Sequence, residues 1–162
     1  MRPKGFFTFE CRNPDGSLAW KEQVPNGTTT AGLNDILNVY FNSGTQKTTW
    51  YMGLIDNSGF SSLSGADTMA SHGGWSENTN YAAGTRPTWV PSAASGGSMT
   101  NPSATAFGIN ATVAIKGAFI VSDSTKGGTG GLLWATGAFG GVQSLTTGQV
   151  LSVTYTEPLT AV

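Results

Sequence analysis

The chain has 162 residues, of which only 10% are charged, and its formal net charge is −1. Its eight lysine and arginine residues are scattered, and its only cysteine and only histidine are Cys11 and His72. This composition argues against nucleic acid binding, an internal disulfide and a four-ligand zinc site, and we expect no metal or cofactor.

The N-terminal segment predicts a β-hairpin. Apolar and polar residues alternate over 6–12, the tetrapeptide at 13–16 is rich in turn formers, and 17–24 reads as the returning strand. The apolar run at the N-terminus ends after Phe9, which is short for a secretory signal. We therefore expect neither export by that route nor a membrane segment.

One amphipathic helix is predicted near the N-terminus, over 28–42. A threonine at 28–30 can cap it, and the sequence Asn-Ser-Gly at 42–44 ends it. Its apolar residues recur with helical spacing in a single stripe, formed by Leu33, Ile36, Leu37, Tyr40 and Phe41. This stripe is expected to lie against one face or end of a β structure.

The segment 48–56 is apolar on both faces, which predicts a central strand. Residues 57–103 form a long stretch rich in glycine, serine and proline. Because this stretch also contains aromatic residues, it is predicted to be ordered. Short strands are expected at 86–90 and 98–100, with a helical turn at 67–71.

The C-terminal third is rich in β-branched and aromatic residues. Four strands are predicted there, at 104–109, 111–122, 132–136 and 149–156, with glycine-rich turns at 123–131 and 137–141. Trp50 and Trp134 lie inside apolar strands and are expected in the core.

Together these elements predict a mainly β fold, an antiparallel β-sandwich resembling a jelly roll, with one helix and a long ordered loop region. A single domain is expected over 1–162, divided into an N-terminal arm or hairpin (1–25), the helix (28–42), and strands and loops (48–162).

No sequence pattern predicts a catalytic site. His72 has Asp67 and Glu77 nearby in the sequence but no nucleophile elbow, so a loop or interface histidine is the favoured interpretation. The glycine run at 126–131 precedes a strand-like segment rather than the helix of a phosphate loop, which predicts a flexible hairpin tip. A glycosidase-like pairing among Asp56, Asp67, Glu77 and Asp123 remains an alternative that sequence alone leaves open.

The segment 87–115 contains no charged residue. A neutral, hydroxyl-rich surface is easier to dehydrate than a charged one, which favours assembly with copies of the same chain or with a partner lattice. Part of this segment is predicted core strand. Its polar half, 91–103, is the expected subunit contact.

Two groups of residues are candidates for a partner interface. The N-terminal segment 1–9 is either the first strand of its own sheet or an arm that adds a strand to a neighbour. Aromatic residues of the long loop either pin that loop to the sandwich, which is favoured, or face a partner or a sugar. The candidate interface residues are Pro3, Gly5, Phe6, Trp75, Tyr81, Trp89, Pro91 and Met99.

The order of several motifs resembles a family of small structural proteins encoded by tailed bacteriophages. The motifs are NGTTTAGLNDILNVYF at 26–41, TTWYMGLID at 48–56, WSE at 75–77, RPTW at 86–89 and IKGAFIVSDSTKGGTGGLLWA at 115–135. The resemblance covers most of the chain and implies a virion component assembled in the host cytoplasm. It implies no catalytic or ligand residue.

The expected function is that of a non-enzymatic capsid decoration or cement protein. Its partners would be the major capsid protein and copies of itself, in a homo-oligomer held by many weak contacts over the shell. A tail or fibre adhesin that stacks Trp75, Tyr81 and Trp89 on host carbohydrate is the alternative. A hydrolase using His72 is a third, less favoured possibility.

Overall fold

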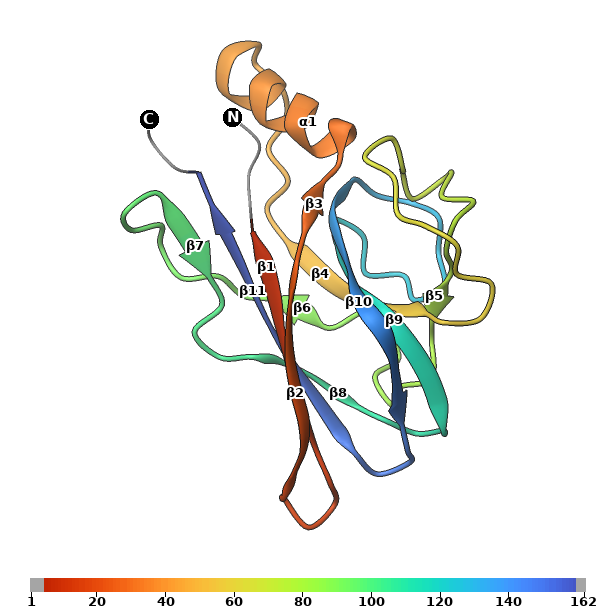
Figure 1. Ribbon diagram of the computed structural model, residues 1–162. Coiled ribbons are helices and arrows are strands. Elements are labelled where there is room, and N and C mark those ends of the chain that lie inside the picture. Colours follow the sequence, from red (N-terminus) through yellow and green to blue (C-terminus); the bar gives the residue numbers. More distant parts are fainter. Residues whose placement is uncertain (1–4, 160–162) are drawn as a thin grey trace.

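The computed structural model describes residues 5–159, which form two antiparallel β-sheets packed face to face, with one helix over one end (Figure 1). The predicted β-sandwich is therefore confirmed. Within residues 5–159, no helix has the length and hydropathy needed to cross a membrane.

The first sheet joins the beginning of the described chain to its end. Its order is β2 (Leu18–Pro25), β1 (Phe6–Arg12), β11 (Val150–Pro158) and β7 (Ser98–Thr100), and β8 (Thr105–Gly108) pairs with the other half of β11. The predicted hairpin is confirmed, and β1 lies between β2 and β11.

The second sheet contains the central part of the chain. Its order is β3 (Gly27–Thr28), β10 (Leu133–Leu145), β9 (Val113–Val121), β4 (Trp50–Asp56) and β5 (Glu77–Asn78), and β6 (Thr88–Trp89) pairs with the other half of β4. Strand β4 is buried on both faces at its centre, as its apolar sequence predicts.

The main core lies between the sheets. In β1 and β11 every second residue is buried, so burial alternates along these strands with the same period of two as the apolar residues in the sequence. A second, smaller core covers the outer face of the second sheet, where the long loop packs Met69 and Trp75 on Phe119 and Val121. The loop is thus ordered, as predicted.

Two local predictions are wrong. The segment 67–71 is a tight turn closed by an antiparallel bridge between Thr68 and Ser71, not a helical turn. The glycines at 137–141 do not end the strand, because β10 continues through them with a break in its register. Glycine at position 137 lets the strand pack closely against Phe7, since a Cβ here would lie 2.7 Å from Cδ2 of Phe7.

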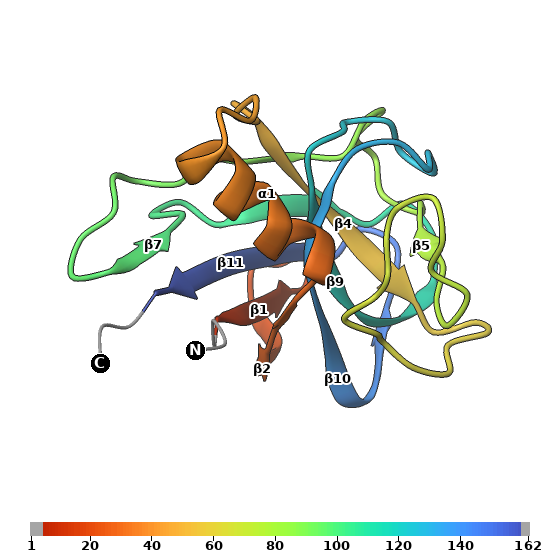
Figure 2. The ribbon, with the colours of Figure 1, turned by 90° about the horizontal axis from the view of Figure 1, so that it is seen from above.

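Helix α1 (Thr30–Phe41) begins at a buried cap. The Thr29 side chain accepts a hydrogen bond from the Gly32 amide (3.0 Å), and the Thr29 amide donates to the Trp134 carbonyl (2.9 Å). At the other end the amides of Asn42 and Gly44 both donate to the Asn38 carbonyl. The first turn is therefore fixed to β10, and from there the helix runs across the top of the sandwich, above the strand ends (Figures 1 and 2).

Candidate functional site

A pocket of about 350 Å³ lies between the sheets, beneath helix α1. Its walls come from α1, β4, β6, β7, β10 and β11, and nearly all of its surface is apolar. The main lining side chains are Ile36, Val39, Tyr40, Trp50, Trp89, Met99, Trp134, Glu157 and Leu159.

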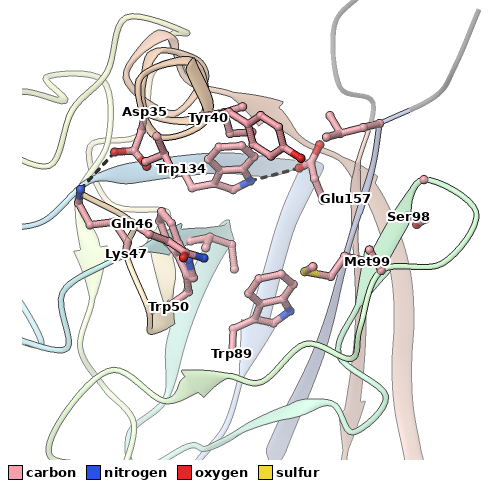
Figure 3. Close-up of a pocket in the computed structure, with 16 residues that line it drawn as sticks. Asp35, Tyr40, Gln46, Lys47, Trp50, Trp89, Ser98, Met99, Trp134 and Glu157 are labelled. Atoms are coloured by element: carbon pink, nitrogen blue, oxygen red, sulfur yellow. Dashed lines mark hydrogen bonds and ion pairs between the residues drawn. The ribbon is translucent and has the colours of Figure 1, made fainter. Parts of the chain in front are cut away.

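Three tryptophans surround this space (Figure 3). Trp50 and Trp134 meet nearly edge to face, with ring centroids 6.0 Å apart. The indole nitrogens of Trp89 and Trp134 are already used, because they donate to Asn101 Oδ1 (3.1 Å) and Tyr155 Oη (2.9 Å). These two residues therefore offer the pocket mainly their carbon atoms.

The carboxylate of Glu157 lines the pocket and is only 8% exposed. Its Oε2 atom accepts hydrogen bonds from Tyr155 Oη, Asn26 Nδ2 and Trp134 Nε1, while Oε1 has no partner among the described residues. Burial raises the pKa of the Glu157 carboxyl, and the donated hydrogen bonds offset this only in part. Burial and the adjacent carboxylate also raise the pKa of Tyr155.

The other charged groups at the pocket neutralise each other. Lys47 Nζ lies 3.2 Å from Asp35 Oδ1 at the side of the pocket below α1 (Figure 3). The mouth of the pocket therefore carries no unbalanced surface charge from these two side chains.

Only part of the apolar stripe of α1 packs against other residues of the chain. Ile36 packs against the main core, and Gly32 is the only buried residue of the helix. By contrast, Leu37, Tyr40 and Phe41 are 54%, 81% and 80% exposed. The helix lies over one end of the sandwich, as predicted, but the C-terminal half of its apolar stripe stays exposed.

The neutral loop borders the same pocket. Residues 92–97 are exposed, and Ala94 and Gly97 line the pocket together with Ser98 and Met99 of β7. The structure thus brings two features far apart in the sequence, the uncharged loop and the apolar end of α1, to one pocket.

The predicted interface residues divide into three groups. Trp89 and Met99 line the pocket, and Pro91 is half-buried at the start of the exposed loop. Trp75 and Tyr81 are buried, which contradicts their proposed role in a partner contact and confirms the favoured pinning role. Trp75 packs on Phe119 and donates to Asp67 Oδ2 (3.0 Å), and Tyr81 packs on Phe107.

The N-terminal arm is also wrong for the residues that the structure describes. Gly5 is buried, and the backbone of Phe6 pairs with Thr156 on one side and Pro25 on the other. Phe6 therefore has no free edge to offer a neighbour, and the segment is the first strand of its own sheet. Pro3 lies outside the described residues.

The sequence candidates for catalysis do not assemble into a site. His72 Nδ1 lies 3.0 Å from the Thr68 carbonyl, and its ring stacks on Trp75 with centroids 4.2 Å apart. The Asp67 carboxylate, which a triad would need, is bound to Trp75 and to the Ser64 amide. Among residues 5–159 no three His, Cys, Asp or Glu side chains are grouped to hold a metal.

Two of the four acidic candidates, Glu77 and Asp123, meet at a fully buried arginine. Arg86 forms a bidentate pair with Glu77 (2.7 and 3.0 Å), and its Nη1 lies 3.8 Å from Asp123 Oδ1. It also donates to the carbonyls of Asp123 and Gly128, while Glu77 accepts from the Gly127 amide. The glycine run thus lies in the hairpin loop between β9 and β10, as predicted, and its Gly127 and Gly128 backbone is hydrogen-bonded to the Glu77–Arg86 pair.

The pocket itself has no motif in the sequence. Its tryptophans are recognisable as core residues, but their convergence at one end depends on pairings such as Trp50 with Trp89. The one sequence feature that points to the pocket is the pair of adjacent aromatic residues, Tyr40 and Phe41, at the end of the helical stripe. Comparison of the sequence with protein-family models gives no match, and comparison with curated proteins gives none either.

Proposed function

We propose that this chain is a structural component of a tailed bacteriophage virion. Specifically, we propose a capsid decoration protein that binds the major capsid protein and copies of itself on the outside of the head. The phage assignment depends on the sequence resemblance. The observation that supports an assembly role is the meeting of the neutral loop 91–97 and the exposed end of α1 at one apolar pocket.

The physical basis is dehydration of neutral surface. A protein that works alone in water gains nothing from three large apolar side chains exposed together on one helix turn. Contact with a lattice would bury them without removing water from an unpaired charge. Many such contacts repeated over a shell then add through effective concentration, so each can be weak.

The carbohydrate-binding alternative loses its original basis, because Trp75, Tyr81 and Trp89 are all less than 10% exposed. Sugar rings stack on accessible aromatic faces. Trp89 faces the pocket beneath α1, and this pocket is nearly all apolar.

Binding to empty heads tests the proposal. Purified protein is added to expanded capsids of the phage whose genome carries this sequence, and occupancy is measured by cosedimentation. We expect saturable binding and a higher temperature of shell disruption. Absence of binding would contradict the proposal, and saturable binding on a glycan array instead would support the adhesin.

A matched pair of variants locates the contact. Ala94→Lys introduces a charge into the exposed neutral loop, and Ala19→Lys introduces the same charge on the exposed strand β2. We expect the first to reduce capsid occupancy at least tenfold and the second to leave it unchanged. Equal effects would show that the loop is not the contact.

A further inference from the structure

The end of helix α1 presents two adjacent aromatic side chains to solvent. Tyr40 and Phe41, which we call the aromatic knob, have ring centroids 5.6 Å apart and are both at least 80% exposed. Leu37 extends the same apolar surface by one helix turn. The capped last turn holds the knob in place, because Asn42 and Gly44 both bond back to Asn38.

The pocket lies directly beside the knob. Tyr40 belongs to both, since it lines the pocket while most of its surface is exposed. The pocket volume of about 350 Å³ is large enough for an aromatic side chain, because an apolar cavity of about 150 Å³ accepts a benzene ring. A protrusion and a matching cavity are therefore adjacent on one surface.

An adjacent protrusion and cavity are self-complementary under two-fold symmetry. When the axis passes between them, the protrusion of each copy enters the cavity of the other, and both contacts form at once. In a head-to-tail pair only one knob would enter a pocket, and the knob of one copy and the pocket of the other would stay unoccupied.

Charge also favours an identical partner. Two copies facing each other bring like charges together, which is costly unless the charges are absent or already paired. Here Asp35 and Lys47 pair within the chain, and the Glu157 carboxylate is buried. The exposed loop residues 92–97 are uncharged. Among residues 5–159, no unpaired charge at the mouth would complement a strongly charged ligand or peptide.

We propose that the occupant of this pocket is the aromatic knob of a second copy, in a two-fold dimer in which Phe41 of each chain enters the pocket of the other. The inference rests on the proposed function, because it identifies the surface through which copies of an assembly protein bind each other. Small apolar ligands and a capsid segment are the competing occupants.

Sedimentation velocity over a hundredfold concentration range tests the dimer, with two matched variants. Phe41→Ser removes one ring of the knob, and Leu18→Ser removes another exposed apolar residue (52%), in the β1–β2 hairpin. We expect at least tenfold weaker dimerisation for Phe41→Ser and wild-type behaviour for Leu18→Ser. Thermal unfolding checks that both variants fold. A wild-type chain that is monomeric throughout overturns the proposal, as does a dimer unaffected by Phe41→Ser.

Cross-linking tests the geometry. A Phe41→Cys chain is mixed with a Met99→Cys chain, at a concentration at which Phe41→Ser still dimerises, and oxidised, with Leu18→Cys replacing Phe41→Cys as the control. Cys11 is fully buried and does not compete. We expect a disulfide only between the first pair. Failure of this pair to cross-link more than the control overturns the proposed arrangement.

The capsid assay separates this inference from the proposed function. A monomeric wild type that still binds shells overturns the dimer alone, and if Phe41→Ser then weakens shell binding, the capsid is the occupant. A dimer that binds no shell supports the interface and contradicts the decoration function. A small apolar ligand that copurifies with the monomer and is lost in Phe41→Ser or Met99→Trp would also overturn the dimer.

Discussion

Gly32 of helix α1 packs directly against the indole of Trp134. A Cβ at position 32 would lie 2.8 Å from Trp134 Cε3 and 3.0 Å from the Trp134 carbonyl oxygen, so only glycine allows the helix to approach β10 this closely. The same indole forms a wall of the pocket. The position of the helix, and with it the roof of the pocket, thus depends on one missing methyl group.

Gly32→Ala should therefore destabilise the protein, although alanine is the better helix former by about 1 kcal/mol. Displacement of the helix from β10 is expected to cost more than this gain, leaving a net loss of about 1–2 kcal/mol. Urea unfolding measures the change. Asn34→Ala, on the exposed side of the same helix, is the control and should not lower stability. A stabilised Gly32→Ala would show that the helix does not need this close contact.

Arg86→Ala should be among the most damaging substitutions in the chain. It leaves the Glu77 carboxylate buried without its cation and removes two hydrogen bonds that hold the 123–128 loop. Breaking such a buried pair costs about 3–5 kcal/mol. Arg12→Ala is the contrasting variant, because its pair with Glu10 is solvent-exposed and worth roughly 0–1 kcal/mol. Similar losses in chemical denaturation would contradict a structural role for the buried pair.

Because of Glu157, the free energy of unfolding should depend on pH at values above the ordinary titration range of a carboxyl group. Its pKa is raised in the folded state, so the native protein holds this proton more tightly than the unfolded chain does. The resulting stabilisation is complete below the unfolded pKa and is lost as the pH rises through the folded value.

Glu157→Gln should remove this pH dependence while keeping an oxygen that accepts from Trp134 and Tyr155. Unfolding free energies measured from pH 4 to 9 should show the variant gaining stability relative to the wild type as the pH rises. Glu10→Gln is the control with the opposite sign, since Arg12 lowers the pKa of Glu10. A parallel profile for wild type and Glu157→Gln would contradict the raised pKa.

Trp75 should be required for order in the long loop. Trp75→Ala removes the largest side chain of the second core and should cost about 3–5 kcal/mol, with rapid proteolysis between 57 and 76. Trp75→Phe keeps a ring on Phe119 but loses the hydrogen bond to Asp67, so a loss of about 1 kcal/mol is expected. If both variants resisted proteolysis equally, Trp75 would not be the anchor.

The sequence predicts the sandwich and its helix because these features depend on local periodicity. Alternation in 6–12 and the stripe from Leu33 to Phe41 both reflect the neighbours of each residue along the chain. Strand pairing is different. The two-residue strands β3 and β5 have no period of their own and exist only because β10 and β4 lie beside them.

The candidate site was harder to predict for the same reason. A helical stripe indicates which face of α1 is apolar, but the length of the sheets beneath it decides that Tyr40 and Phe41 stay exposed. Arg86 is the opposite case, a residue that sequence reasoning places at the surface but that is buried. A charged residue in a polar loop is ordinarily at the surface, and only the convergence of Glu77 with the 123–128 backbone makes its burial favourable.

The pairing of β1 with β11 has a consequence for biosynthesis. Phe7 and Phe9 pair with Tyr155 and Val153, which are synthesised much later. Contacts between such distant parts of a chain form slowly, and here they cannot form until β11 has been synthesised. Nascent chains therefore lack the central strand pair of the first sheet on the ribosome. A chain that lacks β11 therefore has neither this strand pair nor the wall that Glu157 contributes to the pocket.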